Sequence, residues 1–328
     1  MKSSEPLIEK EFTAFLNPYA GQAVVVAVSG GADSVCLLRL FSKFKVSLKL
    51  EVYVGHLNHH ARGPVSDADS AFVVSLSKML NLPVHLGDWH PARDSHFEAD
   101  ARRARYEWLA EVASREGAGL VATGHTRDDQ VETILHRIVR GTGLRGLAGI
   151  PSTRPLAAGV RLIRPLLRTR REEIRAYLRM IGQDWREDAT NADQSRARSR
   201  IRHELLPLLR KGYNPKVDEA LINLGDLARS SDDALDAWIR AWLAKNQVTM
   251  RQSCLRLPAD ALRKQSPHIR IEIIRWIWRE AGWPQQRLTA SHWKSLGALV
   301  DHSGSEIDLV MGIRAKCDES ELTIERPE

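Results

Sequence analysis

The amino-acid sequence predicts an α/β fold, in which a doubly wound parallel sheet is followed by a second, smaller α+β domain. The first observation is the apolar, β-branched run at 23–28, which leads into Ser29-Gly30-Gly31 and indicates a buried parallel strand entering a tight turn. The second is the return of this strand-then-helix order three more times. The third is a change to arginine-rich helical segments from Leu162 onward.

Each helix and strand of this fold is predicted from the local pattern of apolar residues. The helix after the first strand has an apolar face made by Val35, Leu37, Leu38 and Phe41. Three more pairs are predicted, with strands at 46–55, 83–86 and 120–123 before helices near 66–80, 98–115 and 128–139. Beyond them we expect helices at about 216–246 and 259–281 and strands near 306–313 and 320–325.

The turn Gly212-Tyr213-Asn214-Pro215 marks a domain boundary near 215. A chain of 328 residues exceeds a typical single domain, so two units of unequal size are expected. We therefore predict a catalytic domain at 1–215 and a smaller domain at 216–328. The six tryptophans after position 235 are expected mostly to pack the core of the smaller domain.

Composition predicts a globular, cytoplasmic protein without a membrane partner. Hydrophobic residues make up 43% and charged residues 27% of the chain, and no run approaches the ~18 apolar residues that cross a bilayer. The N-terminus lacks a secretory apolar segment. Cys36, Cys254 and Cys317 form no C-x-x-C pair, which argues against a disulfide framework, a zinc ribbon or an iron–sulfur site and fits a reducing compartment.

Positive charge is concentrated in one segment. The chain has a formal net charge of +7, and residues 151–215 hold 14 Arg and 1 Lys against 7 acidic residues. Such a local excess favours a polyanionic partner, because neutralising phosphates releases counterions.

The strongest chemical motif is Ser29-Gly30-Gly31-Ala32-Asp33-Ser34 at the first strand-to-helix turn. Two glycines and a helix N-terminus can present backbone amides to phosphate oxygens, so these six residues are the predicted nucleotide-binding loop. The motif lacks the lysine of a Walker A sequence. An ordinary glycine turn is the alternative. His56 begins H-L-N-H-H-A-R-G at the end of the second strand, where open sheets place ligand-binding residues, and it is predicted to border the same crevice.

A paired-carboxylate motif follows the fourth strand in Gly124-His125-Thr126-Arg127-Asp128-Asp129-Gln130-Val131-Glu132. Asp129 and Glu132 are three residues apart, so both carboxylates share one helical face near the helix N-terminus. Such a pair can hold an ammonium group or Mg²⁺. The alternative is ordinary acidic charge in a first helical turn.

Two basic motifs come next. The loop Arg140-Gly141-Thr142-Gly143-Leu144-Arg145-Gly146-Leu147 could cradle phosphates, or it could only cap a helix. After Asp188-Ala189-Thr190-Asn191 comes a cluster suited to bidentate phosphate contacts, with a solvated helix face as the alternative for each member. Its members are Arg196, Arg198, Arg200 and Arg202.

Across roughly 20–215, these motifs together resemble the tRNA(Ile)-lysidine synthetase family, which belongs to the PP-loop, or N-type ATP pyrophosphatase, superfamily. The resemblance rests on S-G-G-A-D-S, H-L-N-H-H-A-R-G, E-A-D-A-R-R-A-R-Y at 98–106, G-H-T-R-D-D-Q-V-E-T and R-G-T-G-L-R-G-L. Ala61 and Ser199 depart from the family's usual residues. The implied fold is Rossmann-like, of the adenine nucleotide α-hydrolase type.

The resemblance implies an ATP-dependent ligase that forms a carbon–nitrogen bond. ATP adenylates C2 of the wobble cytidine in the tRNA(Ile) with a CAU anticodon, releasing pyrophosphate, and the ε-amine of free L-lysine then displaces AMP to give lysidine. ATP and Mg²⁺ are the implied cofactors. The domain at 216–328 is then the tRNA-recognition domain.

The resemblance also implies roles for individual residues. Lysine binding falls to Asp33, Asp129 and Glu132, with Asp33 also serving Mg²⁺. His125 would contact the adenylate and Arg198 would stabilise anionic groups, which completes the implied catalytic set. The residues implied to bind tRNA are Arg140, Arg145, Arg196, Arg200 and Arg202.

Three competing interpretations remain. A sulfur-inserting tRNA enzyme of the same fold would need catalytic thiols, whereas Cys36 lies on the apolar face of the first helix after the glycine loop. An amidating ligase would use ammonia in place of lysine, and the closely spaced arginines at 196–202 argue against this activity. A noncatalytic RNA-binding protein would not need Asp33, Asp129 and Glu132. The oligomeric state is left open, with a homodimer among the options.

Overall fold

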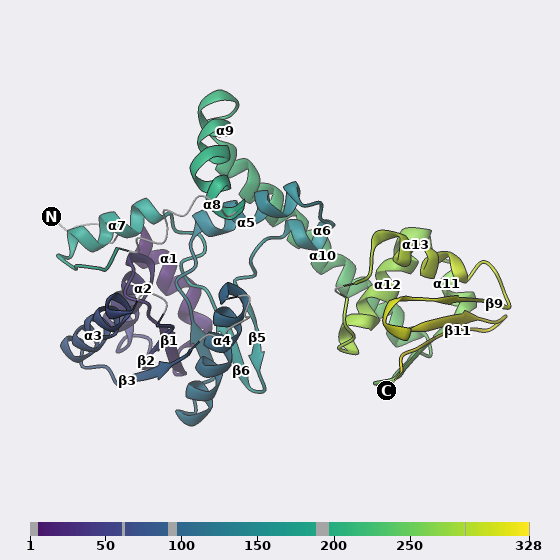
Figure 1. Cartoon of the computed structure of the whole chain (residues 1–328), viewed down its shortest axis with the longest axis horizontal. Coiled ribbons are helices and arrows are strands. Elements are labelled where there is room, and N and C mark those ends of the chain that lie inside the picture. The colour runs from purple at the N-terminus through teal and green to yellow at the C-terminus, as the bar shows by residue number, and fades with distance from the viewer. Residues whose placement is uncertain (1–5, 61–62, 91–96, 188–196, 286, 328) are drawn as a thin grey trace. The chain divides into compact units, whose positions relative to one another are not determined.

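The computed structural model of the chain, drawn in Figure 1, describes residues 6–60, 63–90, 97–187, 197–285 and 287–327. It divides into two compact units, Met1–Ala228 and Arg229–Glu328. The division falls inside a long helix, α10 (Val217–Lys245), and not at the turn near 215. None of the described helices is both long enough and apolar enough to cross a bilayer.

The first unit is built on a six-stranded sheet with the order β3-β2-β1-β4-β6-β5. All neighbouring strands pair in parallel except β5, which lies antiparallel to β6 at one edge. The strand order reverses at β1, so the carboxyl ends of β1 and β4 border the crevice where open α/β sheets bind ligands. The strands are β1 (Ala23–Ala27), β2 (Glu51–Asn58), β3 (Val84–Asp88), β4 (Leu120–Ala122), β5 (Thr153–Ala157) and β6 (Val160–Ile163).

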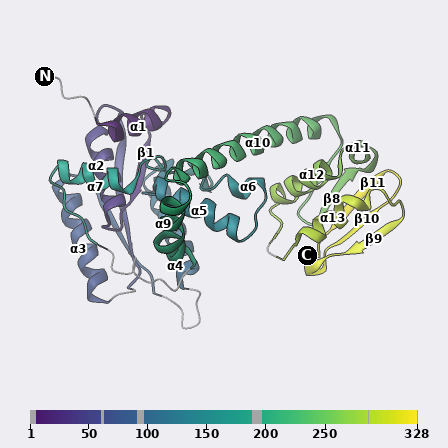
Figure 2. The same cartoon turned by 90° about the horizontal axis from the view of Figure 1, so that it is seen from above.

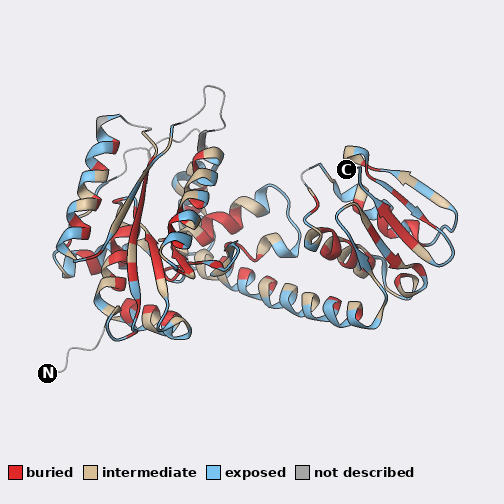
Figure 3. Ribbon diagram, turned by 90° about the horizontal axis from the view of Figure 1, so that it is seen from below, coloured by how far each residue is buried: buried red, intermediate tan, exposed pale blue. Residues whose placement is uncertain are grey.

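Helices cover both faces of this sheet, as a doubly wound fold requires. Val24 and Val26 of β1 pack into one buried cluster with α1, α2, α3 and α7, whereas Val25 packs into a separate cluster with α4 (Figure 2). The alternation follows from the two-residue period of a strand. Figure 3 shows the inner strands buried between exposed outer helix faces. The helices of these two layers are α1 (Leu7–Leu16), α2 (Ala32–Phe44), α3 (Pro64–Met79), α4 (Phe97–Arg115) and α7 (Arg171–Met180), with a 3-10 turn at Asn17–Tyr19.

A third cluster lies where the chain leaves the sheet. Ile134 of α5 packs with Ile201, Leu206 and Leu221, so the beginning of α10 completes the core of the first unit. This packing explains why the compact unit extends past 215. The elements of this region are α5 (Arg127–Val139), α6 (Leu144–Leu147), α8 (Ala197–Arg200), a π-helical segment (Ile201–Leu205) and α9 (Leu206–Gly212).

The structure corrects the sequence-based elements at two places in the first unit. The strand predicted at 46–55 begins only at Glu51, because the preceding residues form a turn in which Val46 is 80% exposed. The hairpin of β5 and β6 was not predicted. Its strand β6 is only four residues long, and the arginines around it favoured a helical interpretation.

The second unit is a five-stranded antiparallel sheet, with the order β7-β8-β11-β10-β9, packed with helices. The helix predicted at 259–281 is two helices, because Ser266 caps a new helix whose first residue is Pro267. The strand predicted at 306–313 ends at Asp308, before a 3-10 turn. The elements are β7 (Thr249–Met250), β8 (Cys254–Pro258), α11 (Ala259–Arg263), α12 (Pro267–Glu280), α13 (Ala290–Leu299), β9 (Ser305–Asp308), a 3-10 turn (Val310–Gly312), β10 (Arg314–Cys317) and β11 (Glu321–Glu325).

Tryptophans form much of the core of the second unit. Trp278 is fully buried, packs edge-on against Trp283 and Trp293 at ring-centroid distances of 5.0 and 5.2 Å, and donates Nε1–H to the Pro284 carbonyl at 3.1 Å. Five of the six tryptophans after 235 are buried, and only Trp238, at 41% exposure, is not. The prediction that these side chains mostly fill the core is confirmed.

Trp278→Ala should destabilise the second unit by about 3–5 kcal/mol, because it removes a buried ring and leaves both a cavity and an unpaired carbonyl. Trp238→Ala is the matched control and should cost less than about 1 kcal/mol, because surface changes rarely cost more. Urea unfolding followed by far-ultraviolet circular dichroism measures both. Equal midpoints for the two variants would contradict the assignment of Trp278 to the core.

Candidate functional site

The loop after β1 is held ready by its own polar contacts. Gly30 has φ +91°, a conformation that favours glycine, and Gly31 caps α2 without any side-chain hydrogen bond. The Ser34 hydroxyl accepts a hydrogen bond from the Ser29 amide at 3.1 Å and donates one to the Gly31 carbonyl at 2.9 Å. The N-terminus of α2 is therefore not capped by a side chain, which suits an anion bound to its first-turn amides.

The loop after β4 lies directly against this turn. A Cβ atom added at Gly124 would lie 3.0 Å from both the carbonyl carbon and the carbonyl oxygen of Asp33, so only glycine allows the two backbones this close approach. The contact brings Asp129 close enough to Asp33 for the Asp129 charge to raise the Asp33 pKa. The strand order, together with this glycine, therefore brings the first and third sequence motifs to one point.

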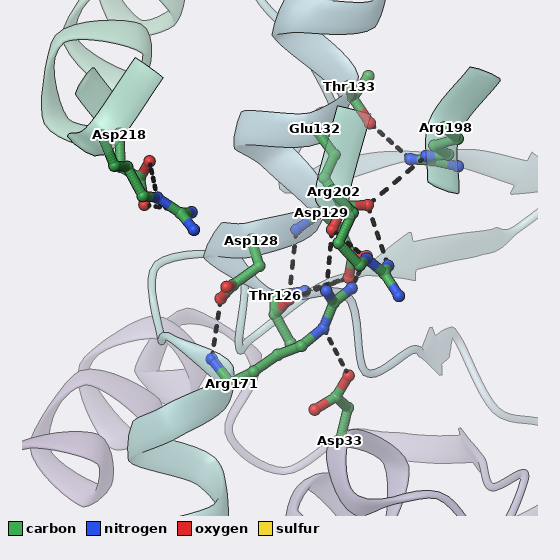
Figure 4. A network of polar contacts seen from close by, with 11 residues as sticks. Asp33, Thr126, Asp128, Asp129, Glu132, Thr133, Arg171, Arg198, Arg202 and Asp218 are labelled. Atoms are coloured by element: carbon green, nitrogen blue, oxygen red, sulfur yellow. Dashed lines mark hydrogen bonds and ion pairs between the residues drawn. The ribbon is translucent and has the colours of Figure 1, made fainter. Parts of the chain in front are cut away.

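Arg171, the first residue of α7, links all three predicted lysine-binding carboxylates (Figure 4). Its Nη1 donates to Glu132 at 2.9 Å, its Nη2 donates to Asp129, and its Nε lies 3.5 Å from Asp33. The Arg171 backbone amide also donates to Asp128 at 2.9 Å. One guanidinium group thus joins α2, α5 and α7.

Glu132 is the most deeply buried of the three carboxylates. Its side chain is 1% exposed, and Arg202 adds a bidentate contact at 2.7 and 3.0 Å to the one from Arg171. Arg198 lies farther from Glu132, at 4.0 Å, and donates instead to the Thr133 hydroxyl at 2.7 Å. A buried charge needs this degree of pairing, because leaving water costs it several kcal/mol.

Asp129 both caps helix α5 and pairs with Arg171. One carboxylate oxygen accepts the Thr126 amide at 2.9 Å in the capping box of α5, and the other accepts the bond from Arg171. Burial alone would raise the pKa of this carboxyl group, but the Arg171 charge and the Thr126 hydrogen bonds hold its pKa below the ordinary value. Asp129 is therefore an anion in the folded protein, and it also caps its helix.

Asp33 is the least compensated of the three. Burial raises its pKa from 3.8 to about 6, and the Arg171 charge only partly opposes this effect. Its side chain is 29% exposed, against 17% for Asp129. A partly open carboxylate at a phosphate-binding turn fits Mg²⁺, which is commonly held by one or two carboxylates together with substrate phosphates and water.

His125 is held in its neutral form. Burial lowers its pKa to about 3, the Asp129 charge opposes this, and the charges of Arg164, Arg102 and Arg105 lower it further. Its Nδ1 lies 2.9 Å from the Thr123 hydroxyl. A neutral imidazole can exchange hydrogen bonds with a substrate, but it carries no proton to donate as an acid near neutral pH.

His56 is buried, and both of its ring nitrogens are held by neighbouring groups. It is 6% exposed, and its ring nitrogens contact the Val28 carbonyl at 2.8 Å and the Ser70 hydroxyl at 2.9 Å. Burial lowers its pKa. Because both ring nitrogens are engaged, His56 supports the backbone at the entrance to the glycine loop.

The arginines predicted to bind tRNA are dispersed. Arg140 and Arg145 are exposed, and Arg200 pairs with Glu204 at 3.4 Å. Arg202 lies in the carboxylate network with Glu132. Arg196 and the motif at 188–191 lie outside the described residues.

Arg171 is the central residue that the sequence did not single out. It is one of 14 arginines in its segment, and its partners come from positions about 40 and 140 residues away. The one local signal is its place before Glu172 and Glu173, where an acidic first turn indicates a helix start.

Fold and site define a PP-loop domain. Residues 4–209 match the PP-loop domain family, and this span includes the glycine loop, the three carboxylates and Arg171. The chain is also similar to the solved structure of a U34-tRNA thiolase from Methanococcus maripaludis, with a TM-score of 0.56 and 15% sequence identity. The match covers 68% of this chain and 78% of that chain, and it supports the fold alone.

The chain belongs to the tRNA(Ile)-lysidine synthase family. The synthase of Rhodopirellula baltica is 31% identical over 88% of this chain and 82% of its own length. Those of Symbiobacterium thermophilum and Solibacter usitatus are 42% and 40% identical over 66% and 78% of this chain. The chain spans about half the length of these last two relatives, matching 45% and 56% of them.

Asp33→Asn should abolish product formation without lowering the melting temperature at pH 7–8. The folded protein keeps a proton on Asp33 up to about pH 6, whereas the unfolded chain loses it near the ordinary value of 3.8. Unfolding free energy therefore falls as pH rises through this window, and removing the charge should recover that loss. Calorimetry of both proteins at pH 5 and pH 8 checks the sign of this change in stability with pH. A clear drop in melting temperature at pH 8 would show that the ionised carboxylate stabilises the fold instead.

Proposed function

We propose that this chain is a tRNA(Ile)-lysidine synthase, an ATP-dependent ligase that uses free L-lysine and the tRNA(Ile) with a CAU anticodon. The observation that carries the proposal is the cluster of Asp33, Asp129 and Glu132 directly beside an amide-lined phosphate turn. Family membership gives the reaction its substrates. The cytoplasm is the proposed location, since the three cysteines are free thiols.

In the first step the cytidine O2 atom forms a bond to the α-phosphorus of ATP, and the bond from that phosphorus to the β-phosphate bridge breaks to release pyrophosphate. The amides of the 29–34 loop stabilise charge on the phosphates. Asp33 is the residue that would hold Mg²⁺, which when bound supplies further positive charge at the phosphates. His125, as a neutral imidazole, would contact the adenylate by hydrogen bonding.

In the second step the lysine ε-nitrogen forms a bond to C2, and AMP leaves with the oxygen. The free ammonium group has a pKa of about 10.4, so the acidic cluster must both bind the cation and accept its proton. With no Mg²⁺ bound to it, Asp33 suits the proton transfer better than Asp129, because burial raises the pKa of Asp33 to about 6 whereas the Arg171 charge and the Thr126 hydrogen bonds hold the pKa of Asp129 below its ordinary value.

The distribution of contacts indicates where the ammonium group enters. Both oxygens of Glu132 are bonded to arginines, and both oxygens of Asp129 are engaged. Among the described residues, the cation nearest to the Asp33 carboxylate is Arg171, at 3.5 Å. We therefore place the ammonium group on the Asp33 side of Arg171, with Asp129 next to it and Glu132 acting by holding Arg171 and Arg202 in position.

Thiolation is the main rival activity, and the thiol environment argues against it. Cys36 is fully buried in α2, and burial strongly raises the pKa of its thiol. Cys254 and Cys317 belong to the other compact unit. A buried thiol kept protonated is a poor nucleophile.

Recognition of the tRNA is the role we propose for the C-terminal segment and for the exposed Arg140, Arg145 and Arg200, together with Arg196. A truncated protein that tests this should end at 228 and not at 215, because Leu221 belongs to the core of the first unit.

Incubation with ATP, labelled lysine and the CAU-anticodon tRNA, followed by nucleoside analysis, should give labelled lysidine. Asp129→Asn and Glu132→Gln should raise the KM for lysine about tenfold or more, equivalent to at least about 1.4 kcal/mol, with the KM for ATP nearly unchanged. Asp218→Asn is the matched control, since that carboxylate is paired with Arg210 at 2.8 Å outside the Arg171 network. Unchanged lysine kinetics in both site variants would remove the amine-binding role from the cluster.

A further inference from the structure

The motif E-A-D-A-R-R-A-R-Y at 98–106 has no part in the site described so far. It lies on α4, where Arg102, Arg105 and Tyr106 share one helical face by their spacing of three and four residues. Arg103 is 69% exposed and pairs with Asp100 at 3.0 Å and Glu107 at 4.0 Å. Helix α4 therefore carries one arginine that is paired with carboxylates, Arg103, and two that lie on the same face as Tyr106, Arg102 and Arg105.

Four arginines gather around the buried ring of Tyr106. The guanidinium carbons of Arg102, Arg105 and Arg154 lie 5.2, 5.5 and 5.1 Å from its centroid. Arg164, which follows β6 and is 2% exposed, lies close enough to Tyr106 for each to influence the other's pKa. We call these four residues the arginine cluster. They come from α4, β5 and the carboxyl end of β6.

Within the part of the chain whose side chains are described, the arginine cluster has no carboxylate partner. Among the residues whose side chains the structure describes, none of the four pairs with a carboxylate; Arg154 and Arg164 donate only to the carbonyls of Pro155 and Pro151. Among the described residues, Nε of Arg105, Nε of Arg164 and the Tyr106 hydroxyl are buried and make no hydrogen bond of good geometry, although Arg105 and Arg164 both lie close enough to the Tyr106 side chain to interact with it. Burial first, and then neighbouring arginines, lower the pKa of Arg105 and of Arg164. Contacts to one aromatic ring, each worth about 0.5–2 kcal/mol, offset only part of this cost.

The position of the arginine cluster connects it to the reaction centre. His125 is influenced by Asp129 and, with opposite sign, by Arg164, Arg102 and Arg105. The Thr123 amide donates to the Ile163 carbonyl at 3.1 Å, so His125 and Arg164 follow paired strand ends. An anion held by these arginines would therefore lie within electrostatic reach of His125. The amides of the 29–34 loop already provide a cradle for ATP phosphates at the N-terminus of α2, on the other side of the sheet from α4.

We propose that the arginine cluster binds a phosphate group of the RNA backbone next to the base that is modified. Guanidinium groups match phosphate oxygens in bidentate geometry, and an entering phosphodiester would supply the missing counter-charge. The inference rests on the proposed function for the identity of the RNA. The same chemistry could also receive a phosphate of ATP, and the experiment separates the two sources.

The test compares Arg105→Gln and Arg102→Gln with Arg103→Gln, the ion-paired neighbour on the same helix. Binding of the CAU-anticodon tRNA is measured without ATP or lysine over a range of salt concentrations, and the dissociation constant of ATP is measured separately by equilibrium binding. Each cluster variant should weaken tRNA binding and flatten the slope of log affinity against log salt by about 0.7–0.9 for each phosphate that the variant no longer neutralises. Arg103→Gln should leave that slope unchanged.

Arg164→Lys extends the test to the buried member while keeping its charge. Because lysine cannot form the bidentate contact, this variant should also weaken tRNA binding, and circular dichroism checks that it folds. A raised dissociation constant for ATP with an unchanged salt slope would assign the arginine cluster to ATP and overturn the RNA proposal. Unchanged values for both ligands in folded variants would overturn the phosphate site altogether. Binding requires no turnover, so failure of wild-type protein to make lysidine would contradict the proposed function without affecting this result.

Discussion

The arrangement of the first unit's site depends on one guanidinium group shared by three carboxylates. Arg171 contacts Asp33, Asp129 and Glu132, which come from two helices that begin after different strands of the sheet. A single positive charge cannot neutralise three negative ones, so Arg202 and the capping box of α5 carry the remainder. Removing the partner of a fully buried charge such as Glu132, which pairs with Arg171, typically costs about 3–5 kcal/mol, because that charge is left unpaired. The network therefore holds together the parts of the chain that the proposed chemistry needs.

Charges of opposite sign act on His125. The carboxylates suit a substrate ammonium group, whereas the arginine cluster around Tyr106 suits phosphate. Burial strengthens both fields, because the local dielectric constant is lower than that of water. The proposed reaction needs this separation, since it brings a cationic amine to an RNA base that is attached to an anionic backbone. Because His125 is neutral, it adds no charge to either group.

The sequence predicted the parallel sheet and the glycine loop from local period, and the pairing of Asp129 with Glu132 from their spacing on one helical face. The grouping of Asp33 with these two carboxylates came from the family resemblance. The sequence did not reveal Arg171, since a residue whose partners lie at three distant positions has no local signature. Arg202 was predicted to face RNA, yet it turns to Glu132, because the buried carboxylate demands a second cation. The strand β6 was missed because it has only four residues and arginines surround it. So short a stretch does not show the two-residue alternation of a strand.

A double-mutant cycle on Arg171 and Glu132 tests the central claim most directly. Unfolding free energies of Arg171→Met, Glu132→Gln and the double variant are measured by urea titration. If the shared guanidinium group organises the site, the double variant should lose less stability than the two single losses combined, by at least about 2 kcal/mol, because each single change leaves a buried charge without its partner. Additive losses within about 0.5 kcal/mol would show that the two residues act independently and would contradict the account.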